Sequence, residues 1–192
     1  AEYLQVYKGG DDGFEFFGGT INANYLISTG SKDDSFDWTY GWAGSGNNWY
    51  ANQASDVGDR GIEGDNDSKN NSNSPYSSPT LTNVTLKGRG IAAETDGMKL
   101  REGTKGSLTN VKIIDFRDGI EVEHAQTVSN AANSELSLSK ITIMNATTDW
   151  AIKSAASAAD STSAATKVGA GVDGTGTGSV DFWTGKSWVK SL

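Results

Sequence analysis

The pentapeptide Asp12-Gly13-Phe14-Glu15-Phe16 is the first copy of a motif that recurs along the chain and decides the fold. Each copy begins with Asp and ends with two apolar residues that flank a polar one. The first two clear copies start 22 residues apart, and so do the next two. The later clear copies are Asp34-Ser35-Phe36-Asp37-Trp38, Asp96-Gly97-Met98-Lys99-Leu100 and Asp118-Gly119-Ile120-Glu121-Val122, with looser ones beginning at Asp59 and Asp149.

A second short β pattern follows about ten residues after each copy, as in Leu81-Thr82-Asn83-Val84-Thr85-Leu86. Its apolar residues alternate with period two and many are β-branched, which argues against a helix. Short strands in 22-residue units, with Gly, Asn and Asp at the corners, predict an all-β, right-handed parallel β-helix (a solenoid) with rungs of about 22 residues. A β-sandwich is the alternative, and the matching register of whole units favours the solenoid.

The composition excludes several classes of function. The chain of 192 residues fits one domain, with 24 acidic and 16 basic side chains, a net charge of −8 and a pI near 4.6. This charge argues against binding to nucleic acid or to anionic lipid. Cysteine is absent and His124 is the sole histidine, which excludes disulfides, thiolate chemistry and multi-histidine metal sites. No apolar run approaches the roughly 18 residues of a membrane span.

We expect a single domain, residues 1–192, with repeated rungs over residues 1–153. One segment interrupts these rungs and two follow them. Residues 64–79 are too polar for a core and predict a loop at one corner, where solenoids often place function. Residues 154–179, rich in Ala, Ser, Gly and Thr, predict a strap that includes a short helix. Residues 180–192 return to an aromatic, strand-like pattern and predict a cap on the C-terminal end of the solenoid.

Several of these segments together resemble a known family. They are Asp11-Asp12-Gly13-Phe14-Glu15-Phe16-Phe17-Gly18-Gly19-Thr20, Asp33-Asp34-Ser35-Phe36-Asp37-Trp38-Thr39, Gly58-Asp59-Arg60-Gly61-Ile62-Glu63, Leu100-Arg101-Glu102-Gly103-Thr104 and Trp183-Thr184-Gly185-Lys186-Ser187-Trp188. The family comprises exported bacterial right-handed parallel β-helix proteins of marine and Bacteroidota type, often labelled as uncharacterised surface proteins. The chain is similar to the C-terminal half of its usual members. The resemblance implies the fold and a secreted or bacterial cell-surface location, and it implies no catalytic residue.

The Asp residues of successive rungs suggest a metal site. Residues one repeat apart stack at about 4.8 Å, so Asp12 would lie beside Asp34. At an effective dielectric of about 20, two carboxylates at this distance repel each other by roughly 3–4 kcal/mol. A structural Ca²⁺ between them would relieve the repulsion. The alternative is that each Asp caps its turn by accepting backbone N–H bonds. The candidate ligands are Asp11, Asp12, Asp33, Asp34 and Asp59, with Asp65 and Asp67 of the loop as a second group.

The polar middle residues of the motif form a further ladder that should point outward from one sheet. Polysaccharide lyases and glycoside hydrolases of this architecture build active sites from such carboxylates, and nearby arginines can bind uronate groups. A solvated face with salt-bridged pairs explains the same residues without chemistry. The candidate catalytic residues are Glu15, Asp37, Glu63, Arg60 and Arg101, and the ladder continues through Lys99 and Glu121.

Aromatic residues between positions 36 and 50 are candidates for stacking on sugar rings, with Asn and Asp to bind hydroxyl groups. They are Trp38, Tyr40, Trp42, Trp49 and Tyr50. The alternative is an internal aromatic ladder.

Three classes of function therefore compete. We favour a non-catalytic structural or adhesive surface protein, and the alternatives are a carbohydrate-binding module and a carbohydrate-active enzyme. A strand already begins near Tyr3, so the first rung should expose an unpaired edge. That edge predicts head-to-tail self-association, or pairing with a missing N-terminal half.

Overall fold

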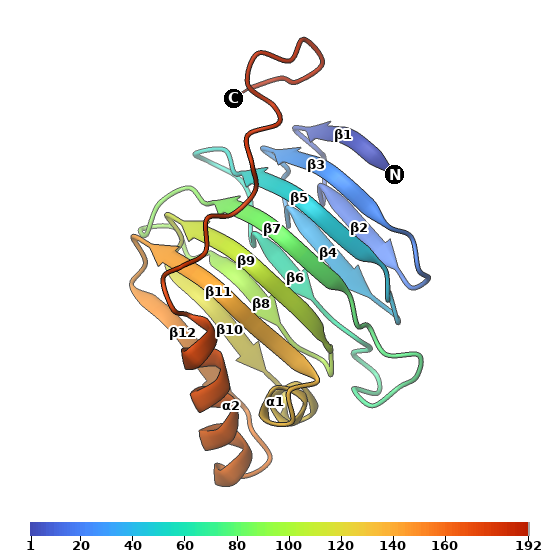
Figure 1. Cartoon of the computed structure of the whole chain (residues 1–192), viewed down its shortest axis with the longest axis vertical. Coiled ribbons are helices and arrows are strands. Elements are labelled where there is room, and N and C mark those ends of the chain that lie inside the picture. Colours follow the sequence, from blue (N-terminus) through green and yellow to red (C-terminus); the bar gives the residue numbers. More distant parts are fainter. Residues whose placement is uncertain (192) are drawn as a thin grey trace.

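The computed structural model describes residues 1–191 and shows a β-helix made of two parallel sheets that face each other across the core (Figure 1). We call them the odd and the even sheet after their strand numbers. The odd sheet contains β1 (Glu2–Tyr7), β3 (Ala23–Thr29), β5 (Ser45–Asn52), β7 (Thr80–Lys87), β9 (Gly106–Ile114) and β11 (Leu136–Met144). The even sheet contains β2 (Phe14–Phe17), β4 (Phe36–Thr39), β6 (Ile62–Gly64), β8 (Asp96–Leu100), β10 (Asp118–Glu123) and β12 (Thr148–Lys153).

The recurring motif forms the even sheet, as the sequence predicts. Its first apolar position pairs from rung to rung, Phe14 with Phe36 and Phe36 with Ile62, and this column points into the core. The parallel β-helix is therefore confirmed. Rung length varies, however. The step from Phe14 to Phe36 is 22 residues, whereas the step from Ile62 to Met98 is 36 because a loop is inserted between them.

The odd strands bend in the middle. One non-glycine residue in each of them has a positive φ, and the pairs on either side place these residues at the same register position, in what we call the bend column. Asparagine tolerates this left-handed conformation better than most residues, and it occupies three successive rungs of the column. The bend column consists of Tyr3, Tyr25, Asn48, Asn83, Asn110 and Lys140.

The polar loop predicted over residues 64–79 lies between β6 and β7, but its base does not project into solvent. Asn66 is 1 % exposed and Ser77 is 0 % exposed. The Asn66 side chain donates to the carbonyls of Asn71 and Asn73 and accepts from the Ser77 N–H. A polar segment can therefore enter the interior because its own groups satisfy one another.

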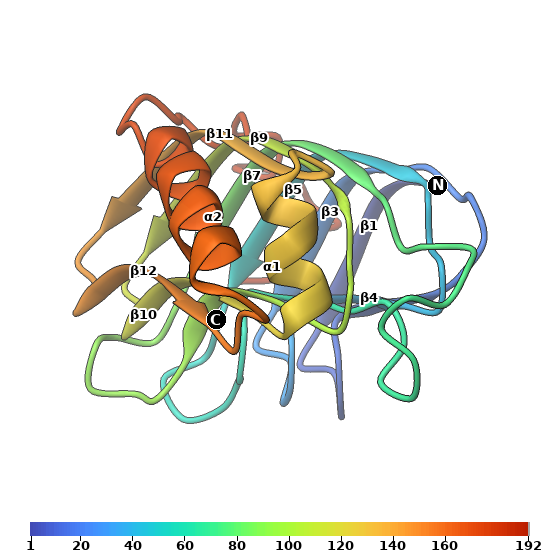
Figure 2. The same ribbon diagram turned by 90° about the horizontal axis from the view of Figure 1, so that it is seen from below.

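Two helices lie at the C-terminal end of the solenoid: one packs against the last strands, β11 and β12, and the other lies at the corner between β10 and β11. Figure 2 shows α1 (Ala125–Ala132) and α2 (Ala158–Gly171) lying side by side there. The helix predicted near the start of the strap is thus confirmed, although it is longer than expected. Ser157 caps it by accepting the Asp160 N–H. Neither helix of the described residues has the length and apolarity required to span a bilayer.

The C-terminal cap predicted over residues 180–192 is wrong. Residues 172–191, which we call the return segment, contain no strand and run back across the odd sheet from β11 to β1 (Figure 1); residue 192 lies outside the described range. The Thr177 N–H donates to Asn110, and the Lys190 N–H donates to Gln5 of the first rung. Aromatic side chains also hold the return segment against the N-terminal rungs: Trp183 stacks on Tyr50 with ring centroids 4.0 Å apart.

Candidate functional site

The outward face of the even sheet carries the ladder of ionisable residues predicted from the motif. The parallel register brings the five positions into one column, with Lys99 interrupting the acids. We call this surface the charged face. Its central column is Glu15, Asp37, Glu63, Lys99 and Glu121.

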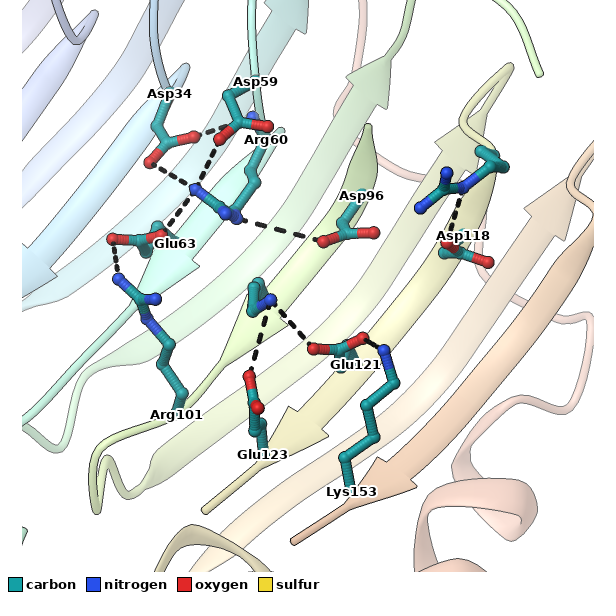
Figure 3. Close-up of polar contacts among 12 residues, drawn as sticks. Asp34, Asp59, Arg60, Glu63, Asp96, Arg101, Asp118, Glu121, Glu123 and Lys153 are labelled. Carbon is teal, nitrogen blue, oxygen red and sulfur yellow. Dashed lines mark hydrogen bonds and ion pairs between the residues drawn. The ribbon is translucent and has the colours of Figure 1, made fainter. Parts of the chain in front are cut away.

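Arg60 neutralises the middle of the charged face (Figure 3). It occupies the rung position that Asp takes in neighbouring copies, since Ile62 pairs with Phe36 and Met98. Its Nη1 lies 2.6 Å from Asp59 Oδ2 and 2.7 Å from Glu63 Oε1. The Arg60 side chain is only 19 % exposed, so its guanidinium group is committed to these carboxylates.

The remaining cations are paired in the same manner (Figure 3). Arg101 Nη2 lies 2.7 Å from Glu63 Oε2, and its Nε lies 3.0 Å from Asp65 Oδ1. Glu121 forms an ion pair with Lys99, whose Nζ lies 2.9 Å from Glu121 Oε1, and also contacts Lys153. The half of the charged face from β6 to β12 is therefore a salt-bridge network. In this arrangement neither Arg60 nor Arg101 is free to accept a proton from a substrate or to bind the carboxylate of a uronate sugar.

The β2–β4 half of the charged face differs, because three of its carboxylates form no ion pair within residues 1–191. Asp12, Glu15 and Asp37 each offer a carboxylate oxygen, and these oxygens lie within 4.8 Å of one another. Asp37 is 9 % exposed, and its buried Oδ1 makes no hydrogen bond within residues 1–191. We call these three residues the acidic corner.

Burial raises the pKa of several carboxyl groups on this face. The pKa of Asp37 rises to about 9 because the side chain is desolvated, with further repulsion from Glu63 and Asp12. Desolvation likewise raises the pKa of Asp34 to about 8 and that of Asp12 to about 6. The pKa of Asp65 rises to about 7, since burial outweighs the favourable charge of Arg101. Some of these carboxyl groups are thus protonated and uncharged near neutral pH.

The Asp columns at the edge of the sheet have the geometry expected of turn caps. Asp12 Oδ1 accepts the Asp34 N–H at 2.9 Å, and Asp34 Oδ1 accepts the Arg60 N–H at 2.7 Å. Turn capping therefore accounts for the position of one carboxylate oxygen in each of these two side chains. In two further groups, carboxylate oxygens also lie within 4.8 Å of one another: Asp11 with Asp12 and Asp33, and Asp33 with Asp34 and Asp59.

The two loop residues predicted as metal ligands do not join an acidic cluster in the described part of the chain. Asp65 pairs with Arg101. Asp67 accepts from the Lys69 N–H and from Asn73 Nδ2, and these bonds lower its pKa. The structure uses both carboxylates to organise the loop and its neighbour.

The predicted aromatic sugar platform is not present at the tryptophans. Trp38, Trp42 and Trp49 are all 0 % exposed and form an internal aromatic cluster. Each indole N–H is bound inside the protein, that of Trp38 by Thr104 Oγ1, for example. Tyr50 is covered by Trp183, so Tyr40 is the exposed member of the predicted set. Period-two alternation could have indicated the burial of Trp38, which follows Phe36 at the spacing of one strand face.

A comparison with protein families can now be set beside this geometry. The family model described as a pectate-lyase-like beta helix domain matches residues 1–189. This chain belongs to that family. Comparisons with curated proteins and with solved structures find no match. The family supports the parallel β-helix expected from the resemblance, whereas bacterial origin, export and surface location stay predictions.

Proposed function

We propose that this member of the pectate-lyase-like β-helix family is a non-catalytic surface scaffold whose acidic corner binds Ca²⁺. The buried Oδ1 of Asp37, which has no hydrogen-bond partner among residues 1–191, lies beside Asp12 and Glu15 and is the observation that carries the proposal. Calcium prefers carboxylate oxygens, and the paired cations of the other rungs lie outside this corner. A secreted or cell-surface location belongs to the same proposal, because weak calcium sites of this kind operate at extracellular concentrations.

Calcium titration of the EGTA-treated protein tests this proposal. We expect binding with a dissociation constant on the order of 10⁻⁴–10⁻³ M, release of protons on binding and a higher melting temperature. Asp37→Asn should abolish the calcium effect but leave the apo protein folded, because Asn resembles the protonated carboxyl group.

Glu123→Gln is the matched control, since it removes an acid of the same face that is paired with Lys99. This variant should keep the calcium response. A wild-type protein with equal melting temperatures in EGTA and in millimolar calcium would contradict the proposal.

A polysaccharide lyase or glycoside hydrolase is the second candidate, and one observation favours it. Asp37, with a pKa raised to about 9, can remain protonated beside Glu15 and so resembles the acid of a carboxylate pair. Arg60, Arg101 and Glu63 are held in ion pairs and are less suited to the reaction. Release of reducing ends or unsaturated sugars from neutral and uronate polymers, lost in Asp37→Asn, would establish the enzyme and overturn the non-catalytic scaffold.

Adhesion and self-association form a separate part of the proposal. Strands β1 and β2 are the outermost strands of their sheets in the described residues. A second copy, or another part of a longer chain, could pair with these edges. Sedimentation velocity over a wide concentration range should show concentration-dependent oligomers if copies of this chain pair there, and a monomer throughout would exclude self-association.

A further inference from the structure

A polar groove of about 490 Å³ lies on the outside of the odd sheet, away from the charged face. Its floor is formed by strands β5, β7 and β9, with Asn83, Asn110 and Lys140 of the bend column, and the return segment supplies one wall. Lys140 is the one charged residue among those that line it. The lining residues are Asn47, Thr82, Asn83, Thr109, Asn110, Lys140, Thr175 and Thr177.

The floor continues a regular array on the first half of the odd strands. Each of four successive strands presents two polar side chains outward with one buried residue between them, as in Thr80-Leu81-Thr82. Parallel pairing aligns the outward residues in two columns. The array is therefore spaced by about 4.8 Å from rung to rung and by about 7 Å along each strand. One column is Ser45, Thr80, Ser107 and Ser137, and the other is Asn47, Thr82, Thr109 and Ser139.

Hydrogen bonds hold these side chains in place. Asn47 Oδ1 accepts from the Thr82 hydroxyl at 3.2 Å and from Asn83 Nδ2 at 2.8 Å. Asn110 Oδ1 accepts from the Thr177 and Gly178 N–H groups, which fixes the wall against the floor. The site is thus rigid before any ligand arrives, which lowers the entropic cost of binding.

Other groups of the groove retain hydrogen-bonding capacity. Asn47 Nδ2 and Lys140 Nζ donate to no partner within residues 1–191. Thr109 and Ser139 share one hydrogen bond of 2.9 Å, so one of their two hydroxyl protons remains available. The groove therefore offers both donors and acceptors at the rung spacing.

We propose that this groove binds a neutral, extended β-linked polysaccharide that runs along the axis of the solenoid. Sugar hydroxyls donate and accept in the same way as the Asn, Thr and Ser groups of the floor, and an extended β-linked chain advances by nearly one rung per sugar. The floor carries no carboxylate although the whole chain has a net charge of −8, and its one cation, Lys140, is balanced by the nearby Asp173, whose pKa it helps to lower. This balance fits an uncharged ligand. Ordered water or ice could use a flat hydroxyl array, but the wall formed by Thr175 and Thr177 makes this site concave and favours a chain-like ligand.

Native affinity electrophoresis in gels that contain mixed-linkage β-glucan or xylan, together with pull-down on cellulose, tests the proposal. We expect the wild-type protein to be retained by at least one of these polymers. The double variant Thr82→Val/Thr109→Val keeps the β-branched shape and removes two hydroxyls, so its affinity should fall about tenfold or more. Thr148→Val, the same change on β12 of the even sheet, is the matched control and should bind normally.

Retention should persist in EGTA, because the acidic corner lies on the other sheet, so this test is independent of the calcium proposal. Circular dichroism and the melting temperature establish that the double variant is folded. No retention of the wild-type protein by any of the three polymers would overturn the proposal, as would equal retention of the folded double variant. Inhibition of ice recrystallisation without polymer retention would also overturn it and assign the array to ordered water.

Discussion

At the scale of single residues, glycine decides how the largest core side chains fit. Gly64 occupies the inward column between Trp38 and Leu100, in register with both. A Cβ atom at Gly64 would lie 2.4 Å from Trp38 Cζ2. The indole cannot easily move away, because its N–H donates to Thr104 Oγ1 at 3.0 Å. The missing side chain therefore provides the space that Trp38 fills.

Gly64→Ala should lower the free energy of unfolding by about 1–3 kcal/mol, since it overpacks this part of the core. Thermal or urea unfolding measures the effect. Gly10→Ala is the control, because a Cβ atom there meets nothing within 4 Å. Equal stabilities of the two variants would show that the core relaxes around the added methyl group.

At the scale of one element, the even sheet separates its charges into two regions. Cations of β6 to β12 and the turns beside these strands are paired with carboxylates, whereas the acidic corner of β2 and β4 depends on protons or on a bound ion. The raised pKa values of Asp34 (about 8) and Asp37 (about 9) follow from this arrangement, because desolvation dominates both. The outward face of the even sheet, which the sequence suggests is mostly acidic, therefore consists of a salt-bridged region and an acidic corner.

This arrangement predicts the pH dependence of stability in EGTA. Between the ordinary Asp pKa of about 4 and the raised native values, the native state holds protons that the unfolded chain has released. The free energy of unfolding should therefore fall as the pH rises through this range. The melting temperature should be higher near about pH 5.5 than near about pH 8.5. Asp37→Asn should reduce the difference, and a melting temperature that rises with pH would contradict the assignment.

At the scale of the whole molecule, the return segment links rungs that do not otherwise touch. In a solenoid each rung contacts its neighbours, so end rungs can fray independently. Here the return segment bonds to Asn110, Thr85 and Asn48 and then to Gln5 of the first rung. One stretch of chain thus couples the last rungs to the first.

Deletion of residues 175–192 should lower the melting temperature and broaden the transition, because the end rungs then lose this coupling. Hydrogen exchange followed by mass spectrometry should show faster exchange in β1 and β3. The amides of β10, on the other sheet, serve as the internal control. Unchanged exchange over β1 and β3 in the truncated protein would mean that the return segment lies on the surface without stabilising it.

Much of the fold could be predicted from local pattern. The motif around Phe14 and Phe36 alternates with period two, and its repetition places equivalent residues in one column. The column of Glu15, Asp37 and Glu63 was predictable for the same reason. The burial of Trp42 and Trp49 was harder to foresee, because turn residues and a bend lie between them and the strand of Trp38.

By itself, the sequence determined the parallel solenoid and the outward ladder, because both depend on periodicities that repeat within each rung. Only the tertiary structure decided which acids meet Arg60 and Arg101, since inserted loops of unequal length set the pairing partners. It also decided that residues 172–191 return to the first rung instead of capping the last. The physical reason is that these contacts join residues far apart in the chain, and their free energy depends on packing and desolvation that no local pattern encodes.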